Sequence, residues 1–242
     1  MRESMDVFGE AIKDHYEGKK AVVKITRDDG YTDPHNVDTY FRSYRDFDLR
    51  EKRALRYVRG RILDVGVGPG RVALYLQRKG FRVTGIDCSK TIVEVAEKRG
   101  VKDCRLMDAR KLSFRPGSFD TILMFGNNFG MAGSKKRTKK MLRDLHRITS
   151  RKGRIIVASI VPGSHLEEHR PYLQRNLERG RDIGLVTLVF EYKGEEGRPF
   201  DLLLVSPVEM MQLCHETGWK IVDVIMGDSK TDHYTAIAEK AR

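Results

Sequence analysis

The chain has 242 residues, of which 40% are apolar and 33% are charged, and its formal net charge is +12. This length allows one sizeable hydrophobic core, so we expect a single domain. No stretch approaches about 18 consecutive apolar residues, and the N-terminus lacks a basic-then-apolar leader, so we expect no membrane association and a cytoplasmic location. Three widely spaced cysteines argue against a disulfide framework or a cysteine zinc site.

The basic excess has more than one physical explanation. Lys and Arg neutralise the phosphates of a nucleic acid. They also form solvated surfaces, and together with Glu they build the ion-pair networks of heat-adapted proteins. Composition leaves these alternatives open, so the charge alone does not identify a partner.

The N-terminal part is expected to form a helix, a β-hairpin and an aromatic segment. Residues 5–16 have the pattern of an amphipathic helix, and 21–26 form a β-type run. Residues 27–30 end in Asp-Gly, which favours a hairpin turn. Asp33-Pro34 is then expected to break the chain. Residues 37–49 carry four aromatic side chains, a stripe typical of helix packing.

A glycine-rich turn at residues 66–70 organises the rest of the chain. The apolar run before it, 62–65, predicts a buried parallel strand, and residues 72–76 predict the start of a helix. Glycines let the backbone reverse and let its N–H groups approach an anionic group. A dinucleotide fingerprint needs a glycine at the position of Arg71, which argues against a nicotinamide cofactor. The next strand ends in Asp87, whose carboxylate can accept hydrogen bonds from both hydroxyls of a ribose.

The pattern D-x-G-x-G-x-G from Asp64 to Gly70, with Asp87 after the second strand, resembles the class I S-adenosylmethionine-dependent methyltransferases. The resemblance covers about residues 60–240. It implies an α/β, Rossmann-like fold: a mostly parallel seven-stranded sheet with an antiparallel last strand and helices on both faces. The implied cofactor is S-adenosyl-L-methionine.

The resemblance also assigns cofactor contacts. The glycine turn approaches the methionine part, Asp64 supports that turn and Asp87 takes the ribose. Asp108, which follows the third strand, receives the adenine amino group, and the backbone at 125–127 faces the amino group or the sulfonium. The family commonly lays N-terminal aromatic rings over the cofactor. The full set of expected cofactor contacts is Asp64, Gly66, Val67, Gly68, Gly70, Asp87, Cys88, Asp108, Ala109, Phe125, Gly126, Asn127, Tyr40 and Tyr44.

The middle of the chain alternates strands and helices. Ser89 is a favourable N-cap residue and Gly100 a favourable stop for the helix between them. The other expected elements are strands at 101–107, 119–125 and 154–160 and a helix at 135–146.

Residues 161–205 interrupt this alternation, with a helical pattern followed by two strands. In the resembled family such an insertion covers the acceptor. Enzymes that methylate exocyclic base nitrogens show Asn/Asp-Pro-Pro-aromatic after the fourth strand, and this chain has no prolines there. Our candidates for holding the acceptor are Asn127, Asn128, Phe129, His165, His169 and Tyr172.

The C-terminal part is expected to complete the cofactor-binding core. Ser206-Pro207 with Glu209 forms a capping box before a helix, and strands at 219–226 and 233–238 close the sheet. The domain is thus expected to comprise an extension (1–59), a core (60–160 and 206–242) and the insertion (161–205).

Two weaker signals remain. His165 to His169 matches the zinc motif H-x-x-E-H, but no third ligand can be identified, so we expect no metal site. The run 135–140 carries five positive charges at an expected helix N-terminus; we interpret it as a solvated helix face, with an anion that compensates the charges as the alternative. No residue stands out as a catalytic base.

Three hypotheses follow. The chain is expected to be a methyltransferase acting on a small-molecule acceptor. The alternatives are an RNA methyltransferase, which the net charge favours, and a non-catalytic adenosylmethionine-binding module, which the absence of an identifiable base favours. The sequence does not indicate an oligomeric state.

Overall fold

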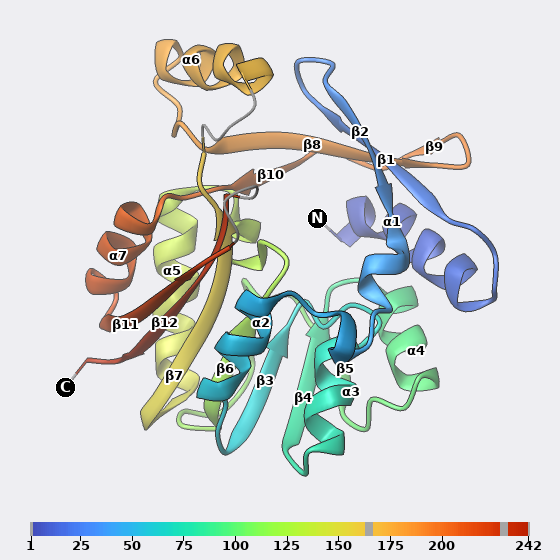
Figure 1. Cartoon of the computed structure of the whole chain (residues 1–242). Helices are drawn as coiled ribbons and strands as arrows, with labels where there is room; N and C mark the ends of the chain where they lie inside the picture. The colour runs from blue at the N-terminus through green and yellow to red at the C-terminus, as the bar shows by residue number, and fades with distance from the viewer. Residues whose placement is uncertain (1, 163–166, 228–231, 242) are drawn as a thin grey trace. The chain divides into compact units, whose positions relative to one another are not determined.

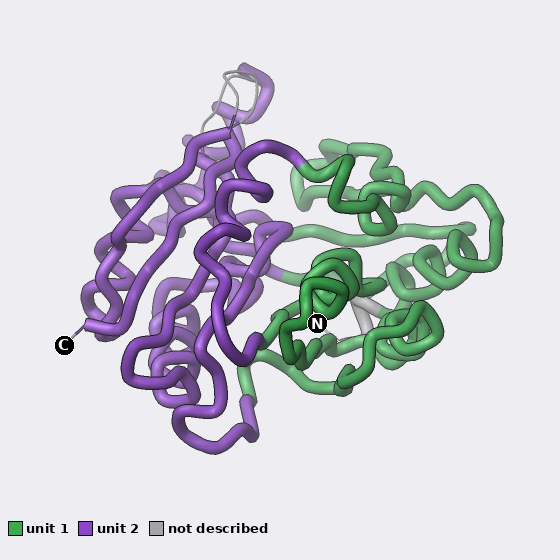
Figure 2. The backbone as a smooth tube through the Cα atoms, turned by 60° about the horizontal axis from the view of Figure 1, so that its bottom comes forward, with its two compact units in different colours: residues 1–47, 63–111, 187–200 green, residues 48–62, 112–186, 201–242 purple. Residues whose placement is uncertain are grey.

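The computed structural model describes residues 2–162, 167–227 and 232–241 (Figure 1), with side chains from Asp6 onward. The chain forms two compact units (Figure 2). Unit 1 comprises residues 1–47, 63–111 and 187–200, and unit 2 comprises residues 48–62, 112–186 and 201–242. The expected single methyltransferase domain, with its extension, core and insertion, stays a prediction. Among the described residues, no helix is long and apolar enough to cross a membrane.

A seven-stranded sheet confirms the expected fold class. Its strand order is β11-β12-β7-β6-β3-β4-β5. Neighbours β4 and β5 are parallel, as are β6 and β7, whereas β12 runs antiparallel to both β7 and β11. The strands are β3 (Arg61–Val65), β4 (Arg82–Asp87), β5 (Cys104–Leu106), β6 (Phe119–Met124), β7 (Thr149–Ile160), β11 (Trp219–Met226) and β12 (His233–Lys240).

Unit 1 combines the N-terminal elements with the first helices of the core. Strand β1 pairs antiparallel with β2 on one side and with β8 on the other, and Lys24 and Glu191 form an ion pair across the β1–β8 pairing at 2.7 Å. Residues 187–200, expected in a cover over the acceptor, therefore belong with the N-terminal hairpin. The elements are α1 (Arg2–Tyr16), β1 (Val22–Arg27), β2 (Thr32–Asn36), α3 (Arg71–Arg78), α4 (Lys90–Lys98), β8 (Leu185–Tyr192) and β9 (Glu195–Glu196).

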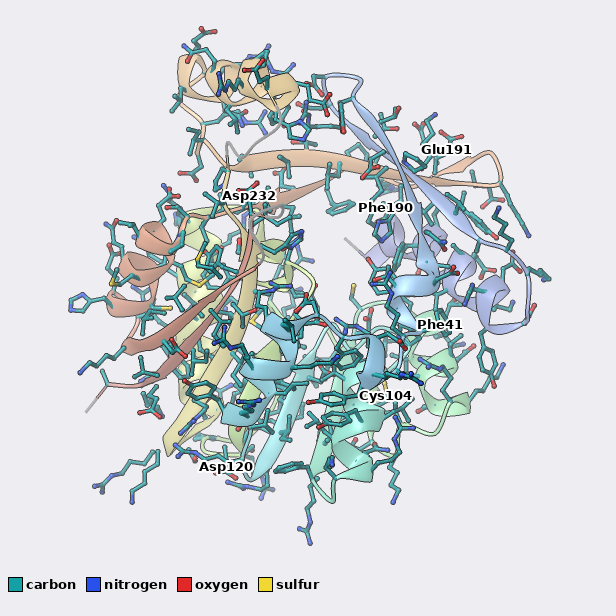
Figure 3. The ribbon with its side chains drawn as sticks, in the orientation of Figure 1. Phe41, Cys104, Asp120, Phe190, Glu191 and Asp232 are labelled. Carbon is teal, nitrogen blue, oxygen red and sulfur yellow. The ribbon has the colours of Figure 1, made fainter. Side chains whose placement is uncertain are left out.

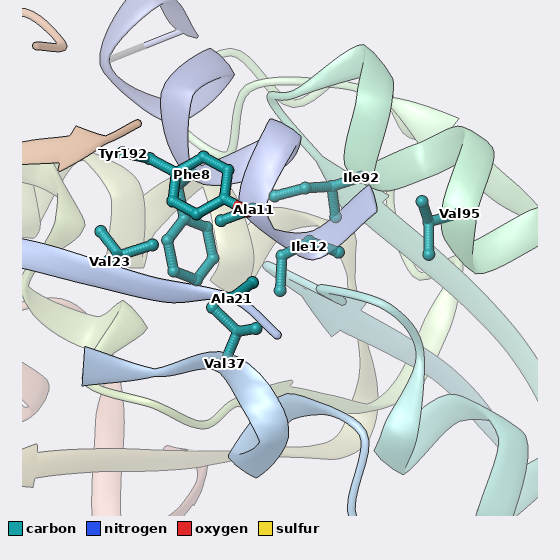
Figure 4. Close-up of a cluster of buried hydrophobic side chains, with 9 residues drawn as sticks. All are labelled: Phe8, Ala11, Ile12, Ala21, Val23, Val37, Ile92, Val95 and Tyr192. Atoms are coloured by element: carbon teal, nitrogen blue, oxygen red, sulfur yellow. The ribbon is translucent and has the colours of Figure 1, made fainter. Parts of the chain in front are cut away.

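The hydrophobic core of unit 1 lies between α1, α4 and the sheet that contains β1, β2 and β8. Helix α1 approaches α4 closely at Gly9, where a Cβ atom would stand 2.7 Å from Ser89 Oγ. Apolar side chains from both helices and from the strands fill the space beside this contact (Figure 4). The cluster contains Phe8, Ala11, Ile12, Ala21, Val23, Val37, Ile92, Val95 and Tyr192.

Unit 2 packs helices against the C-terminal half of the seven-stranded sheet. Helix α7 packs on β11, and α2 contacts β11 and β12. Trp219 is 1% exposed, and its indole N–H donates to the Leu142 carbonyl of α5 at 3.1 Å. The expected capping box of α7 is present at Ser206 and Glu209. The elements are α2 (Leu49–Ala54), α5 (Lys135–Ile148), α6 (Arg170–Glu178), β10 (Phe200–Leu203) and α7 (Pro207–His215).

Three local expectations were wrong. Strand β2 runs through Asp33 and Pro34. It is an edge strand of the sheet ordered β10-β8-β1-β2, and an edge strand tolerates a residue that lacks a backbone N–H. Residues 37–49 form two short 3₁₀ turns, Val37–Tyr40 and Tyr44–Asp46, before α2 begins at Leu49. Strand β5 is also shorter than expected, from Cys104 to Leu106.

Candidate cofactor and acceptor sites

The turn after β3 is a tight reversal that begins helix α3. Gly66, Gly68 and Gly70 have φ values of +69°, +55° and +87°, a region that side chains with a Cβ rarely adopt. The N–H groups of Gly66 and Val67 donate to the Ile86 carbonyl at 2.9 and 3.0 Å, which ties the turn to the end of β4. Gly70 is the N-cap of α3 and supplies no capping side chain. Helix α3 thus begins without a capping side chain, as helices that bind anionic groups at their N-terminus do.

Asp87 connects this turn to β4. Its carboxylate accepts hydrogen bonds from the Gly68 N–H at 3.3 Å and the Ser89 N–H at 3.1 Å. The residue is 7% exposed, and burial raises the pKa of its carboxyl to about 6. A Cβ atom built on Gly68 would meet no atom of the described residues within 4 Å. The turn thus leaves open space beside a buried carboxylate, and this arrangement fits an adenosine ribose with two hydroxyl donors.

Asp108 and Arg110 form a close ion pair at the end of β5. The Arg110 guanidinium donates to both carboxylate oxygens, to Oδ1 at 2.9 Å and to Oδ2 at 2.5 Å in its shortest contact. Burial acts to raise the pKa of Asp108, but the hydrogen bonds from Arg110 outweigh it and the pKa is lowered. Arg110 had no signal in the sequence. The adenine contact of Asp108 stays a prediction, and its carboxylate would have to accept a further donor beside Arg110.

The positions flanking Asp87 and Asp108 are less polar. Ala109 is 5% exposed. Burial is the main reason that the pKa of the Cys88 thiol rises to about 12, so this thiol is neutral at physiological pH. A small side chain and a neutral thiol suit contact with a flat aromatic base, which keeps both positions as predicted cofactor contacts.

Tyr40 and Tyr44 lie on the segment between β2 and α2. The Tyr40 hydroxyl lies 3.0 Å from His35 Nε2, and its ring packs edge-on against Phe8. Burial raises the pKa of Tyr40 to about 12. Tyr44 stacks on Tyr75 of α3 with ring centroids 4.0 Å apart and planes 2° from parallel. One face of Tyr44 is therefore covered by the chain itself, and cofactor contacts of both tyrosines stay predictions.

The turn after β6 has a different construction. Asn127 has a φ of +65°, and its buried Oδ1 has no hydrogen-bond partner among the described residues. Phe129 is fully buried. A Cβ atom on Gly130 would stand 2.1 Å from the Leu203 carbonyl oxygen, so the chain just before α7 lies directly on this turn. The unpartnered amide oxygen is the group on this turn that requires a donor, and a ligand ammonium, amine or hydroxyl would supply one.

The rest of the predicted cofactor and acceptor set is only partly described. Phe125 is 5% exposed, and Gly126 has a φ of +62° with open space around its Cα. His165 lies outside the described residues. Tyr172 is 2% exposed, and the Arg175 guanidinium lies 4.8 Å from its ring centroid. The acceptor roles of Asn128, Phe129, His165, His169 and Tyr172 stay predictions.

Metal ligation finds no support in the described part of the chain, where no group of three or more His, Cys, Asp or Glu side chains could hold a metal ion. The second histidine of the zinc motif, His169, belongs to a short 3₁₀ turn, Glu167–His169.

Two lysines of the basic run at the start of α5 are paired with carboxylates from distant segments of the chain. Lys135 Nζ lies 3.0 Å from both Asp182 and Glu209. Lys139 pairs with Glu216 at 2.5 Å. The sequence could not show these partners, because most of them come from segments distant along the chain.

Comparison with known proteins identifies the family. A model described as "Methyltransferase domain" matches residues 62–153. A Bacteroides fragilis methyltransferase, solved in complex with S-adenosyl-L-homocysteine, is 30% identical, with a TM-score of 0.82 over 99% of this chain and 97% of that one.

Two curated relatives are similar over shorter stretches. The Thermotoga maritima protein named demethylmenaquinone methyltransferase is 37% identical over 106 residues, which is 42% of this chain and 44% of that protein. An uncharacterized protein of Methanocaldococcus jannaschii is 35% identical over 169 residues, 67% of this chain and 65% of its own length. The chain thus spans between two fifths and two thirds of these two proteins. The match to the Bacteroides protein over 99% of this chain, together with the glycine turn and the sheet order, shows that the chain belongs to the class I S-adenosylmethionine-dependent methyltransferase family.

Proposed function

We propose that the protein binds S-adenosylmethionine at the turn after β3 and transfers its methyl group to a small-molecule acceptor. The observation that carries this proposal is the buried carboxylate of Asp87, which is joined to the Gly68 N–H beside open space. S-adenosyl-L-homocysteine, which the Bacteroides fragilis relative holds, is the product of methyl transfer from this donor.

The chemistry makes modest demands on the chain. The sulfonium of the donor is a good leaving group, so methyl transfer is an in-line displacement that depends mainly on alignment and on exclusion of water. In this proposal Asp87 accepts the two ribose hydroxyls and fixes the adenosine. The glycine turn lets the methionine part lie against its N–H groups, and Asn127 Oδ1 accepts a hydrogen bond from the methionine ammonium or from the acceptor.

Two observations favour a small acceptor. Lys135 and Lys139 of the basic run are bound to Asp182, Glu209 and Glu216, which balances part of its charge. The Thermotoga maritima relative is named demethylmenaquinone methyltransferase, after a small-molecule acceptor. A carboxylate already paired with lysine removes much of the local field that would attract RNA.

RNA is the second candidate, and the charge distribution favours it. Unit 2 carries 25 Lys and Arg against 15 Asp and Glu, whereas unit 1 carries 21 against 19. Most of the net +12 therefore belongs to the unit that contains the predicted acceptor turn. An RNA acceptor requires binding that weakens steeply with salt.

The cofactor part is tested by calorimetric titration of the protein with S-adenosylhomocysteine at pH 8. We expect Asp87→Asn to weaken binding about a hundredfold, because two hydrogen bonds to a charged acceptor are lost. Asp103→Asn is the matched control: this carboxylate also belongs to unit 1 but pairs with Arg105 at 2.8 Å, and we expect its affinity to match the wild type. Absence of any binding by the wild-type protein would refute the proposal.

The acceptor part is tested with methyl-labelled S-adenosylmethionine and a cell extract, with and without ribonuclease. Label in low-molecular-weight solutes supports the small-molecule proposal. Label in ribonuclease-sensitive material supports the RNA candidate instead. Turnover of either kind rules out a module that only binds the cofactor.

A further inference from the structure

The turn after β3 is supported from a second side, which the family motif does not include. Residues 99–101, just after α4, lie against it. A Cβ atom on Gly70 would stand 2.4 Å from Val101 Cγ2, so the end of the turn is pressed against this residue. The Arg99 guanidinium donates a hydrogen bond to the carbonyl oxygen of Pro69, in the middle of the turn.

The backbone that carries Arg99 is itself fixed. Arg99 is the C-cap of α4, and the chain after it is bound by one side chain of α3. Gln77 Nε2 donates to the Gly100 carbonyl at 3.0 Å, and Gln77 Oε1 accepts from the Lys102 N–H at 2.9 Å. The guanidinium therefore reaches the turn from an ordered support.

The same guanidinium also contacts the aromatic segment. Arg99 Cζ lies 4.6 Å from the ring centroid of Phe41, which Figure 3 labels on the segment between β2 and α2. A cation near an aromatic face is attracted by the ring, more strongly where water is excluded. The His15 ring lies 4.4 Å from the same phenyl ring, by centroid. The Arg99 side chain thus touches both the glycine turn and the segment 37–47.

Two further contacts attach this segment to α3. The Arg71 guanidinium lies 4.7 Å from the ring centroid of Phe47, and Tyr44 stacks on Tyr75. Arg71 follows the glycine turn directly, and Tyr75 lies about one helical turn further along α3. The segment is consequently anchored on the elements that shape the turn, and Arg99 is the side chain that also bonds to the turn itself.

We propose that Arg99 is a positioning residue for the cofactor, because it holds the Pro69 carbonyl and the Phe41 ring at once and so orders the glycine turn and segment 37–47 together. This inference rests on the proposed function, in which that turn binds S-adenosylmethionine. A turn held in its binding conformation before the cofactor arrives binds more tightly, since less conformational entropy is lost on association.

A double-mutant cycle on S-adenosylhomocysteine affinity tests the coupling. We expect Arg99→Met to weaken binding about tenfold, the size of one hydrogen bond to a charged donor, and Phe41→Leu to weaken it about threefold. Because both act through the same contact, the double variant should bind no more weakly than Arg99→Met alone. Arg99→Lys keeps a donor for Pro69 but loses the planar stacking group, so its affinity should lie between wild type and Arg99→Met.

Hydrogen exchange on the ligand-free protein gives a readout independent of cofactor binding. In Arg99→Met and Arg99→Lys, amides of 37–47 and of 66–70 should exchange faster together, while those of the α1 and α4 core stay protected. Arg82→Met, which removes an exposed guanidinium at the start of β4, is the matched control and should leave affinity within about twofold of the wild type.

The outcomes separate this inference from the proposed function. If the wild type does not bind S-adenosylhomocysteine, the proposed function fails, and the exchange measurement still decides whether Arg99 couples the two segments. If the wild type binds and the Arg99 variants bind equally well, or if the effects of Arg99→Met and Phe41→Leu simply add, the positioning role is overturned. A lower thermal midpoint with unchanged affinity would likewise assign Arg99 a purely structural role.

Discussion

Two turns that follow strands of the seven-stranded sheet contain glycines that do different work. In the turn after β3, the space where a Gly68 side chain would stand is open, and the carboxylate of Asp87 lies beside it. In the turn after β6, the space where a Gly130 side chain would stand is filled by the carbonyl of Leu203. The first position leaves open space, where we propose that the cofactor lies, and the second makes room for the chain's own backbone.

The helices that begin after these turns differ in the same way. Helix α3 is capped by Gly70, which has no side chain to offer its first amides. Helix α5 is capped by Ser134, whose hydroxyl accepts from the Arg137 N–H at 3.3 Å. A glycine therefore indicates that something comes close to the backbone, but only the surrounding structure tells whether that is a ligand or another part of the protein.

The largest effect is expected from Gly130→Ala. The added methyl group would overlap the Leu203 backbone, which is not a flexible group that can turn aside, so we expect a loss of about 3 kcal/mol in the free energy of unfolding. Urea denaturation measures this. Gly117→Ala, at an open position of unit 2 with a φ of +68°, separates backbone strain from overlap and should cost about 1 kcal/mol. Equal losses in the two variants would contradict the close approach at Gly130.

Gly68→Ala should lower cofactor affinity more than it lowers stability. Its methyl group points into open space, so the free energy of unfolding should fall by only about 1 kcal/mol, from the positive φ. S-adenosylhomocysteine affinity should fall roughly thirtyfold, because the methyl group occupies space next to the ligand. Calorimetric titration and urea denaturation on the same preparation check both numbers. A strong loss of stability with full affinity would remove the distinction between the two turns.

Asp87 makes cofactor affinity depend on pH. Burial raises the pKa of its carboxyl to about 6, so the ionised form that accepts ribose hydroxyls prevails above pH 6 and is lost below it. We expect the dissociation constant of S-adenosylhomocysteine to rise about tenfold between pH 8 and pH 5. In Asp87→Asn this dependence should be absent, and its persistence there would assign the titration to another group.

The raised pKa of Asp87 lowers the stability of the ligand-free protein at neutral pH. The folded pKa of Asp87 lies above its ordinary value of 3.8, so the buried carboxylate costs stability at pH 7 to 8. That cost disappears as the pH falls from about 6 to 4, since the folded form then takes up a proton before the unfolded chain does. The ligand-free protein thus gives up stability at neutral pH for a carboxylate that is ready to bind.

Much of the core fold could be predicted from the sequence because its signals are local. The strand before Gly66, the strand that ends at Asp87 and the capping box at Ser206 each follow from neighbouring residues. The family resemblance supplies the seven-stranded, mostly parallel sheet with its antiparallel last strand. The pairing of β1 with β8 could not be predicted, since it joins residues such as Lys24 and Glu191 that are distant in sequence. Pro34 was misjudged because its effect depends on whether its strand lies at an edge.

The residues of the candidate sites likewise divide into those with a local sequence signal and those without one. The motif indicated Asp87 and the glycine turn because their spacing along the chain is fixed by one strand, one turn and one helix. Arg99 and Arg110 carried no signal, because neither belongs to the motif and arginines are common in this basic chain. The partners of the basic run were hidden for a similar reason, since Asp182 and Glu209 reach Lys135 only in the folded unit.

The smallest effect concerns that basic run, which begins directly after the turn that follows β6. Lys135 lies between two carboxylates, and its side chain is 39% exposed, so water screens the pair strongly. Lys135→Met should lower the free energy of unfolding by less than about 1 kcal/mol. Salt at about 1 M should shrink that difference, because it screens partly exposed charges.

Lys135→Met also bears on the acceptor, when compared with Lys136→Met. Lys136 is exposed on the same helix. If unit 2 contacts RNA through this helix, Lys136→Met should weaken transfer-RNA binding in a filter assay at low salt, whereas Lys135→Met should not, because the charge of Lys135 is already balanced. Failure of both to change binding means that the helix does not contact RNA. A larger loss from Lys135→Met would show that Lys135 leaves its carboxylate partners to bind a phosphate. The segment after β6 would then be a ligand-binding segment, as we propose for the turn after β3.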